Sequence, residues 1–81
     1  MDRDEQIEAW KNRKWRKGKK GADYQDIAYR VAVMPDSQDP DVWTWVINKP
    51  AKEPEWSEDH YDDKDAAMQA ALVRLADILG I

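Results

Sequence analysis

With 81 residues and no cysteine, this chain has room for one domain with a thin core, which neither disulfides nor thiolate-bound metal can stabilise. Its 17 acidic and 13 basic side chains give a net charge of −4. Residues 1–21 carry eight basic and four acidic groups, a net charge of +4, whereas residues 22–81 carry five basic and 13 acidic groups, a net charge of −8. We therefore predict a single domain with a basic N-terminal helix or arm, 1–21, and an acidic α+β body, 22–81.

The start of the chain is polar and acidic, and it lacks the positive segment and the apolar stretch of a secretory signal. No apolar run approaches the roughly 20 residues that cross a membrane. We therefore expect a cytoplasmic protein without a membrane partner, and the lack of cysteine suits that reducing compartment.

The N-terminal segment predicts a helix over residues 3–17. Asp2 or Asp4 can cap this helix, and cations gather at its C-terminal end, where the helix dipole favours them. Its apolar stripe is weak, because Trp15 is rotated away from Trp10 around the helix axis. Such a short helix must dock onto the body or remain frayed.

Two strands are predicted next, over residues 24–34 and 42–48, separated by a segment of turn-forming residues at 35–41. They form an antiparallel hairpin, and the residues near Glu55–Ser57 allow a short third strand. One face of the first strand would carry Ile27, Tyr29, Val31 and Val33.

The C-terminal segment predicts a helix that begins after an N-cap at Asp62 and ends near Leu79, before Gly80. Its apolar stripe consists of Met68, Ala71, Leu72, Leu75, Ile78 and Leu79. The element order α-β-β-(β)-α indicates an α+β fold: a small antiparallel sheet with the C-terminal helix packed on one face, together with the N-terminal helix.

The second strand leaves the position of two tryptophans open. Trp43 and Trp45 share one face with Ile47, while Val42 and Val46 lie on the other. If the tryptophans face the C-terminal helix, they belong to the core. If the valines face it, the tryptophans need a cover, supplied either by the N-terminal helix or by a partner protein.

The sequence lacks the residue combinations that catalysis requires. Its single histidine, His60, and its two serines, Ser37 and Ser57, form no nucleophile motif, and no glycine-rich phosphate-binding loop is present. The acids around His60 suit a helix start better than a metal site, because the pattern of a calcium-binding loop is missing. We therefore predict a non-enzymatic protein without cofactor or metal.

The acidic body favours a protein–protein contact through an acidic, tryptophan-bearing surface, with a partner that carries a basic surface. Small size and dense charge are typical of accessory or inhibitor proteins of phages and mobile elements, which can occupy a nucleic-acid-binding site on their partner. The candidate residues for this contact are Trp43, Trp45, Asp36, Asp39, Asp41, Glu55, Glu58 and Asp59.

The alternative is a nucleic-acid-binding protein that uses the basic arm. Lysine and arginine neutralise phosphates, and tryptophan stacks on bases. The candidate residues are Trp10, Lys11, Arg13, Lys14, Trp15, Arg16, Lys17, Lys19 and Lys20. A free sheet edge also leaves homodimerisation open.

Overall fold

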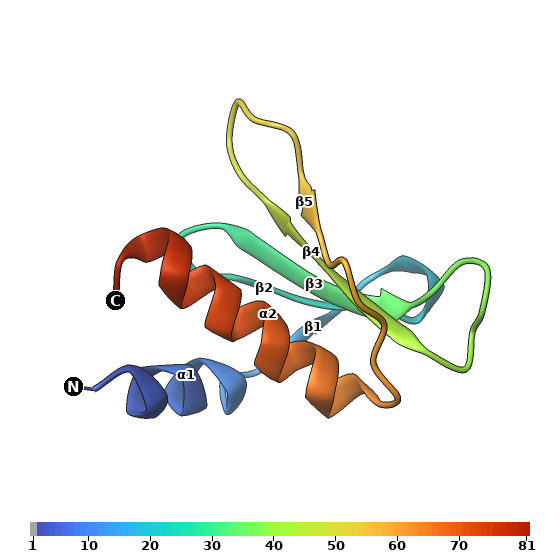
Figure 1. Cartoon of the computed structure of the whole chain (residues 1–81), viewed down its shortest axis with the longest axis horizontal. Helices are drawn as coiled ribbons and strands as arrows, with labels where there is room; N and C mark the ends of the chain where they lie inside the picture. Colours follow the sequence, from blue (N-terminus) through green and yellow to red (C-terminus); the bar gives the residue numbers. More distant parts are fainter. Residues whose placement is uncertain (1) are drawn as a thin grey trace.

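Two helices lie on the same face of a five-stranded antiparallel sheet in the computed structural model, which describes residues 2–81 (Figure 1). The elements follow in the order α1 (Arg3–Lys11), β1 (Arg16–Lys17), the 3₁₀ turn η1 (Lys19–Gly21), β2 (Asp23–Asp26), β3 (Arg30–Pro35), β4 (Trp43–Asn48), β5 (Glu55–Trp56) and α2 (Lys64–Leu79). The strands lie side by side in sequence order. The predicted α+β class, an antiparallel sheet with an N-terminal and a C-terminal helix, is confirmed.

The N-terminal helix is shorter than predicted. Asp2 caps it, because its carboxylate accepts a hydrogen bond from the backbone N–H of Glu5 at 2.9 Å. The helix ends at Lys11, so its predicted continuation over residues 12–17 is wrong. The last two of these residues instead form β1, where they pair with β2.

The single strand predicted over 24–34 is also wrong, because a bend divides it into β2 and β3. At this bend the backbone N–H of Ile27 donates to the carbonyl of Tyr29 at 3.1 Å. The guanidinium of Arg30 then reaches back to Asp26 through two hydrogen bonds, of 2.8 and 3.1 Å. Ile27 and Tyr29 at the bend still pack against the core, so the apolar alternation of the sequence continues through it. The sequence pattern therefore gives no sign of the turn.

The remaining elements lie close to their predicted bounds. The short third strand near Glu55–Ser57 is present as β5. The N-cap of α2 is Asp63 and not Asp62, since the Asp63 carboxylate accepts the backbone N–H of Ala66 at 2.7 Å. Gly80 ends the helix as predicted, with a φ of +75° that glycine adopts readily. No helix formed by residues 2–81 is long and apolar enough to cross a membrane.

The core lies between the sheet and the two helices. It consists of Ile7, Trp10, Val31, Val33, Trp45, Ile47, Ala67, Met68, Ala71, Leu72, Leu75 and Ala76. The alanines of α2 carry so little side chain that the helix can lie close to the sheet. Trp45 therefore belongs to the core, and Trp43 is half-buried against it, which is one of the alternatives that the sequence left open.

The opposite face of the sheet, named the open face here, carries the alternate residues of each strand. Its central row contains one residue from every strand, in the order Arg16, Tyr24, Ala32, Val46 and Trp56. Ala32 and Val46 are buried in the middle of this row, whereas Trp56 at its end is 54% exposed. Both helices lie on the other side of the sheet (Figure 1).

A buried carboxylate fastens β2 to its surroundings. Asp23 is 3% exposed and accepts hydrogen bonds from the ammonium groups of Lys17 in β1, at 2.8 Å, and of Lys64 in α2, at 2.7 Å. Burial raises the pKa of the Asp23 carboxyl, but the hydrogen bonds and charges of the two lysines outweigh that effect, so the pKa lies below its usual value. The edge strand, its neighbour and the first turn of α2 thus share one ionic contact.

Candidate functional site

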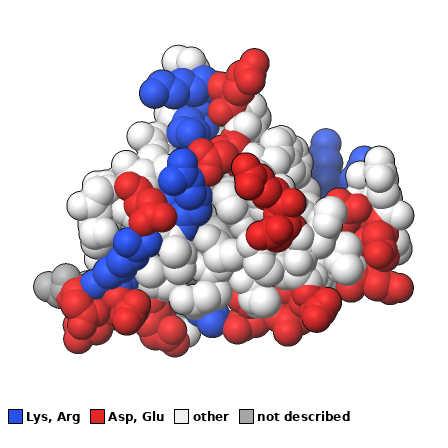
Figure 2. All heavy atoms as spheres, viewed as in Figure 1, with Lys and Arg blue, Asp and Glu red and all other residues white. Residues whose placement is uncertain are grey.

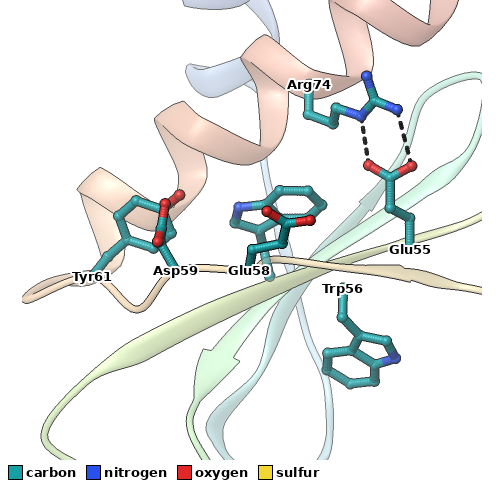
Figure 3. A pocket seen from close by; sticks show the side chains of 7 residues that line it. Glu55, Trp56, Glu58, Asp59, Tyr61 and Arg74 are labelled. Carbon is teal, nitrogen blue, oxygen red and sulfur yellow. Dashed lines mark hydrogen bonds and ion pairs between the residues drawn. The ribbon is translucent and has the colours of Figure 1, made fainter.

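A groove of about 520 Å³ opens between α2 and the segment that begins with β5 (Figure 3). Its lining residues are Trp45, Glu55, Trp56, Glu58, Asp59, Tyr61 and Arg74. The structure thus brings together four residues predicted for the protein contact, namely Trp45, Glu55, Glu58 and Asp59. We refer to this site as the acidic groove.

Backbone pairing holds the rim of the acidic groove against β4. The N–H of Ser57 donates to the carbonyl of Trp45 at 3.0 Å. Trp43 and Tyr61 then exchange two backbone hydrogen bonds, of 2.7 and 2.9 Å. Because the chain is fastened at both of these points, the two acids between them, at positions 58 and 59, are held at the rim.

Trp45 lines the groove and carries a buried hydrogen-bond donor without a partner. Trp45 is 7% exposed, and its Nε1–H is buried and has no acceptor among residues 2–81. A buried N–H without a partner costs about 1–3 kcal/mol. An oxygen atom that reached this donor would recover that energy.

The charges of the groove are divided between paired and unpaired carboxylates. Glu55 accepts hydrogen bonds from Arg74 and, at 3.2 Å, from Lys49, and Figure 3 shows the Arg74 guanidinium directed at it. The hydrogen bond from Arg74 is the main reason why the pKa of Glu55 lies below its usual value. Glu58 and Asp59 are exposed and form no ion pair with any of residues 2–81, so they supply the uncompensated negative charge.

The other predicted acids lie outside the acidic groove, in the turn between β3 and β4. The Asp36 carboxylate accepts the backbone N–H groups of Gln38 and Asp39 at 3.0 and 3.1 Å, and Asp39 accepts that of Asp41 at 3.1 Å. The hydrogen bond from Gln38 is the main reason why the pKa of Asp36 is lowered. These carboxylates stabilise their own turn, and their role in a protein contact stays a prediction.

Trp43, the remaining predicted residue, lies beside the groove. Its ring is half-buried against the core, and the Lys64 ammonium lies 5.9 Å from the ring centroid. Among residues 2–81, no three His, Asp or Glu side chains gather closely enough to hold a metal ion.

The basic arm begins with α1, which packs on the sheet, and continues into β1, which forms one edge of the sheet. Its tryptophans are occupied: Trp10 is buried in the core, and the half-buried Trp15 donates its Nε1–H to the carbonyl of Lys11 at 3.1 Å. Lys11 and Lys17 form ion pairs. The cations of the arm that are exposed and have no ion pair within residues 2–81 are Arg13, Lys14, Arg16, Lys19 and Lys20. The arm therefore offers charge to a ligand, whereas the Trp10 ring is buried and the Trp15 ring is half-buried against the core.

On the face that Figure 2 shows, acidic side chains gather along the lower edge and at one end, and the Lys and Arg side chains follow a narrower band through the centre.

Sequence reasoning missed Arg74, Tyr61 and the exposed Trp56 as surface features. The alternation in β5 contained a signal for the last of these, since Trp56 must point away from the side that Glu55 occupies.

Comparison with protein-family models, curated proteins and solved structures finds no match for this chain.

Proposed function

We propose that this protein is a non-enzymatic protein-binding domain that holds a basic segment of its partner in the acidic groove. The observation that carries the proposal is the combination of the unpaired Trp45 donor with two unpaired carboxylates, Glu58 and Asp59, around one groove. A guanidinium of the partner pairs with the carboxylates, while a neighbouring backbone carbonyl displaces a rim side chain and accepts the indole N–H.

The rest of the chain supports a partner with a basic surface. Residues 22–81 carry a net charge of −8, which steers a positively charged surface toward the groove. A partner site that normally binds nucleic acid has such a positively charged surface. By occupying a site of this kind, the protein acts as an adaptor or inhibitor of phage or mobile-element type. We also propose a cytoplasmic site of action, where a chain without cysteine is indifferent to reducing conditions.

The test uses a nona-arginine peptide as the probe and a peptide of citrulline, the neutral isostere of arginine, as its control. Binding is followed in ¹H–¹⁵N spectra through the indole N–H signals of the five tryptophans, with Trp45 assigned by the Trp45→Phe variant. We expect the arginine peptide to shift the Trp45 signal in the direction of stronger hydrogen bonding, and the citrulline peptide to leave it unchanged.

The variant that tests the rim is Glu58→Gln/Asp59→Asn, and its matched control is Glu53→Gln/Asp62→Asn, which removes two exposed acids that do not line the groove. Loss of two exposed ion pairs weakens peptide binding about tenfold. Equal weakening by both double variants would show that only the overall negative charge binds the peptide. An unmoved Trp45 signal at saturation would exclude the groove as the binding site.

A further inference from the structure

The open face of the sheet presents two flat aromatic groups on a floor of small side chains. In the central row, Ala32 and Val46 separate Tyr24 from Trp56, so the two aromatic residues stand three strand spacings apart, roughly 14 Å. Trp56 is 54% exposed, and Figure 3 shows its ring on the side of β5 away from Glu58. The Arg30 guanidinium lies 4.7 Å from the centroid of the Tyr24 ring. The face therefore offers a free indole at one end and a stacked tyrosine–arginine pair at the other.

Flat groups on an antiparallel sheet whose other face carries the helices are suited to unpaired bases. Bases stack on aromatic rings and on guanidinium planes, and they can do so only where they are not already stacked inside a duplex. A hollow of about 680 Å³ adjoins Trp56 on this side, and Met34, Thr44 and Lys20 are among its lining residues. A base that stacks on the indole can thus place its edge against polar and cationic groups.

The charges around the open face complement a phosphate backbone. Arg16 opens the central row, Lys14 shares a second hollow with it, and Lys20 lines the hollow beside Trp56. All three are exposed and unpaired within residues 2–81. Two acids of this face are paired: Asp26 is bound by Arg30, and Asp36 lies 3.2 Å from the His60 imidazole. The unpaired Glu58 and Asp59 line the acidic groove together with Trp56, and Glu58 lies on the side of β5 away from the Trp56 ring.

We propose that the open face binds single-stranded nucleic acid, with one base on Trp56, a second on the Tyr24–Arg30 pair and the phosphates along the β1 edge. This site lies on the opposite side of the sheet from the helices, and of its residues only Trp56 also lines the acidic groove. It also differs from an arm that stacks bases on its own tryptophans, because Trp10 is buried in the core and Trp15 is half-buried against it.

The test measures the fluorescence anisotropy of labelled twelve-nucleotide dT and rU strands, with the full chain, at 50 and 200 mM salt. Comparison of the affinities for the deoxyribose strand and the ribose strand shows whether the site prefers DNA or RNA. Because each phosphate contact contributes a slope of about 0.7, three contacts predict an affinity loss of about 20-fold between the two salt concentrations. Trp56→Ala weakens binding about 5- to 150-fold and Trp56→Phe restores much of it. The control Ile81→Ala, which removes an exposed apolar side chain at the C-terminus, has no effect.

The cations are tested by Lys14→Ala/Arg16→Ala/Lys20→Ala, which removes most of the salt dependence, against Lys52→Ala, which does not. Retained binding after Trp56→Ala, or a preference for duplex over single strand, overturns the proposal, and so does association of the chain with itself through Trp56 in sedimentation. The triple variant does not lose affinity for nona-arginine, and Glu58→Gln/Asp59→Asn, which removes two negative charges near Trp56, does not lose affinity for the oligonucleotide. Failure of either proposal is thereby recognised separately.

Discussion

The ionic contact of Asp23 with Lys17 and Lys64 predicts that loss of the carboxylate and loss of the lysines destabilise the fold to different extents. Asp23 is 3% exposed, whereas the side chains of Lys17 and Lys64 are 77% and 38% exposed. Replacement of Asp23 by asparagine frees two lysines that can turn toward water. Replacement of both lysines by methionine instead leaves a buried carboxylate without a partner.

The two replacements therefore differ in cost. Asp23→Asn loses two charge-assisted hydrogen bonds but also removes the desolvation penalty of the carboxylate, and we expect a net loss of about 1–2 kcal/mol. Lys17→Met/Lys64→Met leaves an uncompensated buried charge, which costs about 3–5 kcal/mol. A domain of this length has a free energy of unfolding of about 4–12 kcal/mol, so the second variant stands close to the limit of folding.

The pH dependence of stability separates the two variants further. In the native protein the pKa of Asp23 is lowered, so its stabilisation is fully present above the unfolded value of about 3.9 and is lost as the pH falls through the folded pKa. Without the lysines, burial alone acts and raises the pKa of this carboxyl. The destabilisation is then complete above the raised pKa and disappears as the pH falls to about 3.9.

The assay is urea unfolding followed by tryptophan fluorescence between pH 3 and pH 7, with Asp23→Asn as the reference that lacks the titrating group. Other carboxylates with lowered pKa values, such as Asp36 and Glu55, contribute equally to every variant and cancel in the differences. The reasoning is refuted if Asp23→Asn costs as much as the double lysine replacement, or if both variants show the pH slope of the native protein.

Three further predictions concern stability alone. Gly80→Ala costs about 1 kcal/mol through the backbone only, because Gly80 has a φ of +75° and a Cβ there meets no atom within 4 Å; an unchanged melting temperature in circular dichroism would contradict this. Ala51→Gly stabilises by about 0.5–1 kcal/mol, because Ala51 has a φ of +59°; a lower urea midpoint would show that its methyl group is needed. Leu72→Ala costs about 2–5 kcal/mol, because Leu72 is fully buried between α2 and the sheet; a loss below 1 kcal/mol in the same urea assay would mean that the core collapses around the gap.

Much of the fold was predictable because its signals are local. The stripe of Leu72 and Leu75 recurs at helical spacing, and Gly80 marks the end of that helix. The alternation of Val31 and Val33 likewise indicates a strand. Two features depend on partners distant in sequence and were therefore missed. The end of α1 at Lys11 follows from the pairing of β1 with β2, and the bend between β2 and β3 is concealed by apolar residues that remain in contact with the core.

The candidate site was predictable only in part, for the same reason. Glu58 and Asp59 stand out as acids in a loop, and Trp45 stands out as an aromatic residue in a strand. Their meeting around one groove requires α2 to deliver Arg74 to Glu55, 19 positions away along the chain. The alternation of a strand shows which residues share a face, but the choice of which face receives the helices is made by packing.

The two outer strands, β1 and β5, contain two residues each, and β1 consists of Arg16 and Lys17 alone. Growth of a cross-β aggregate needs a long, flat edge on which another chain can add its own strand. Here each outer strand is only two residues long, and an added chain at the β1 side would meet the side chains of an arginine and a lysine. The longer apolar strands β3 and β4 lie inside the sheet, where β2 and β5 separate them from a strand added by another chain. At high concentration the folded chain should therefore resist polymerisation through its sheet.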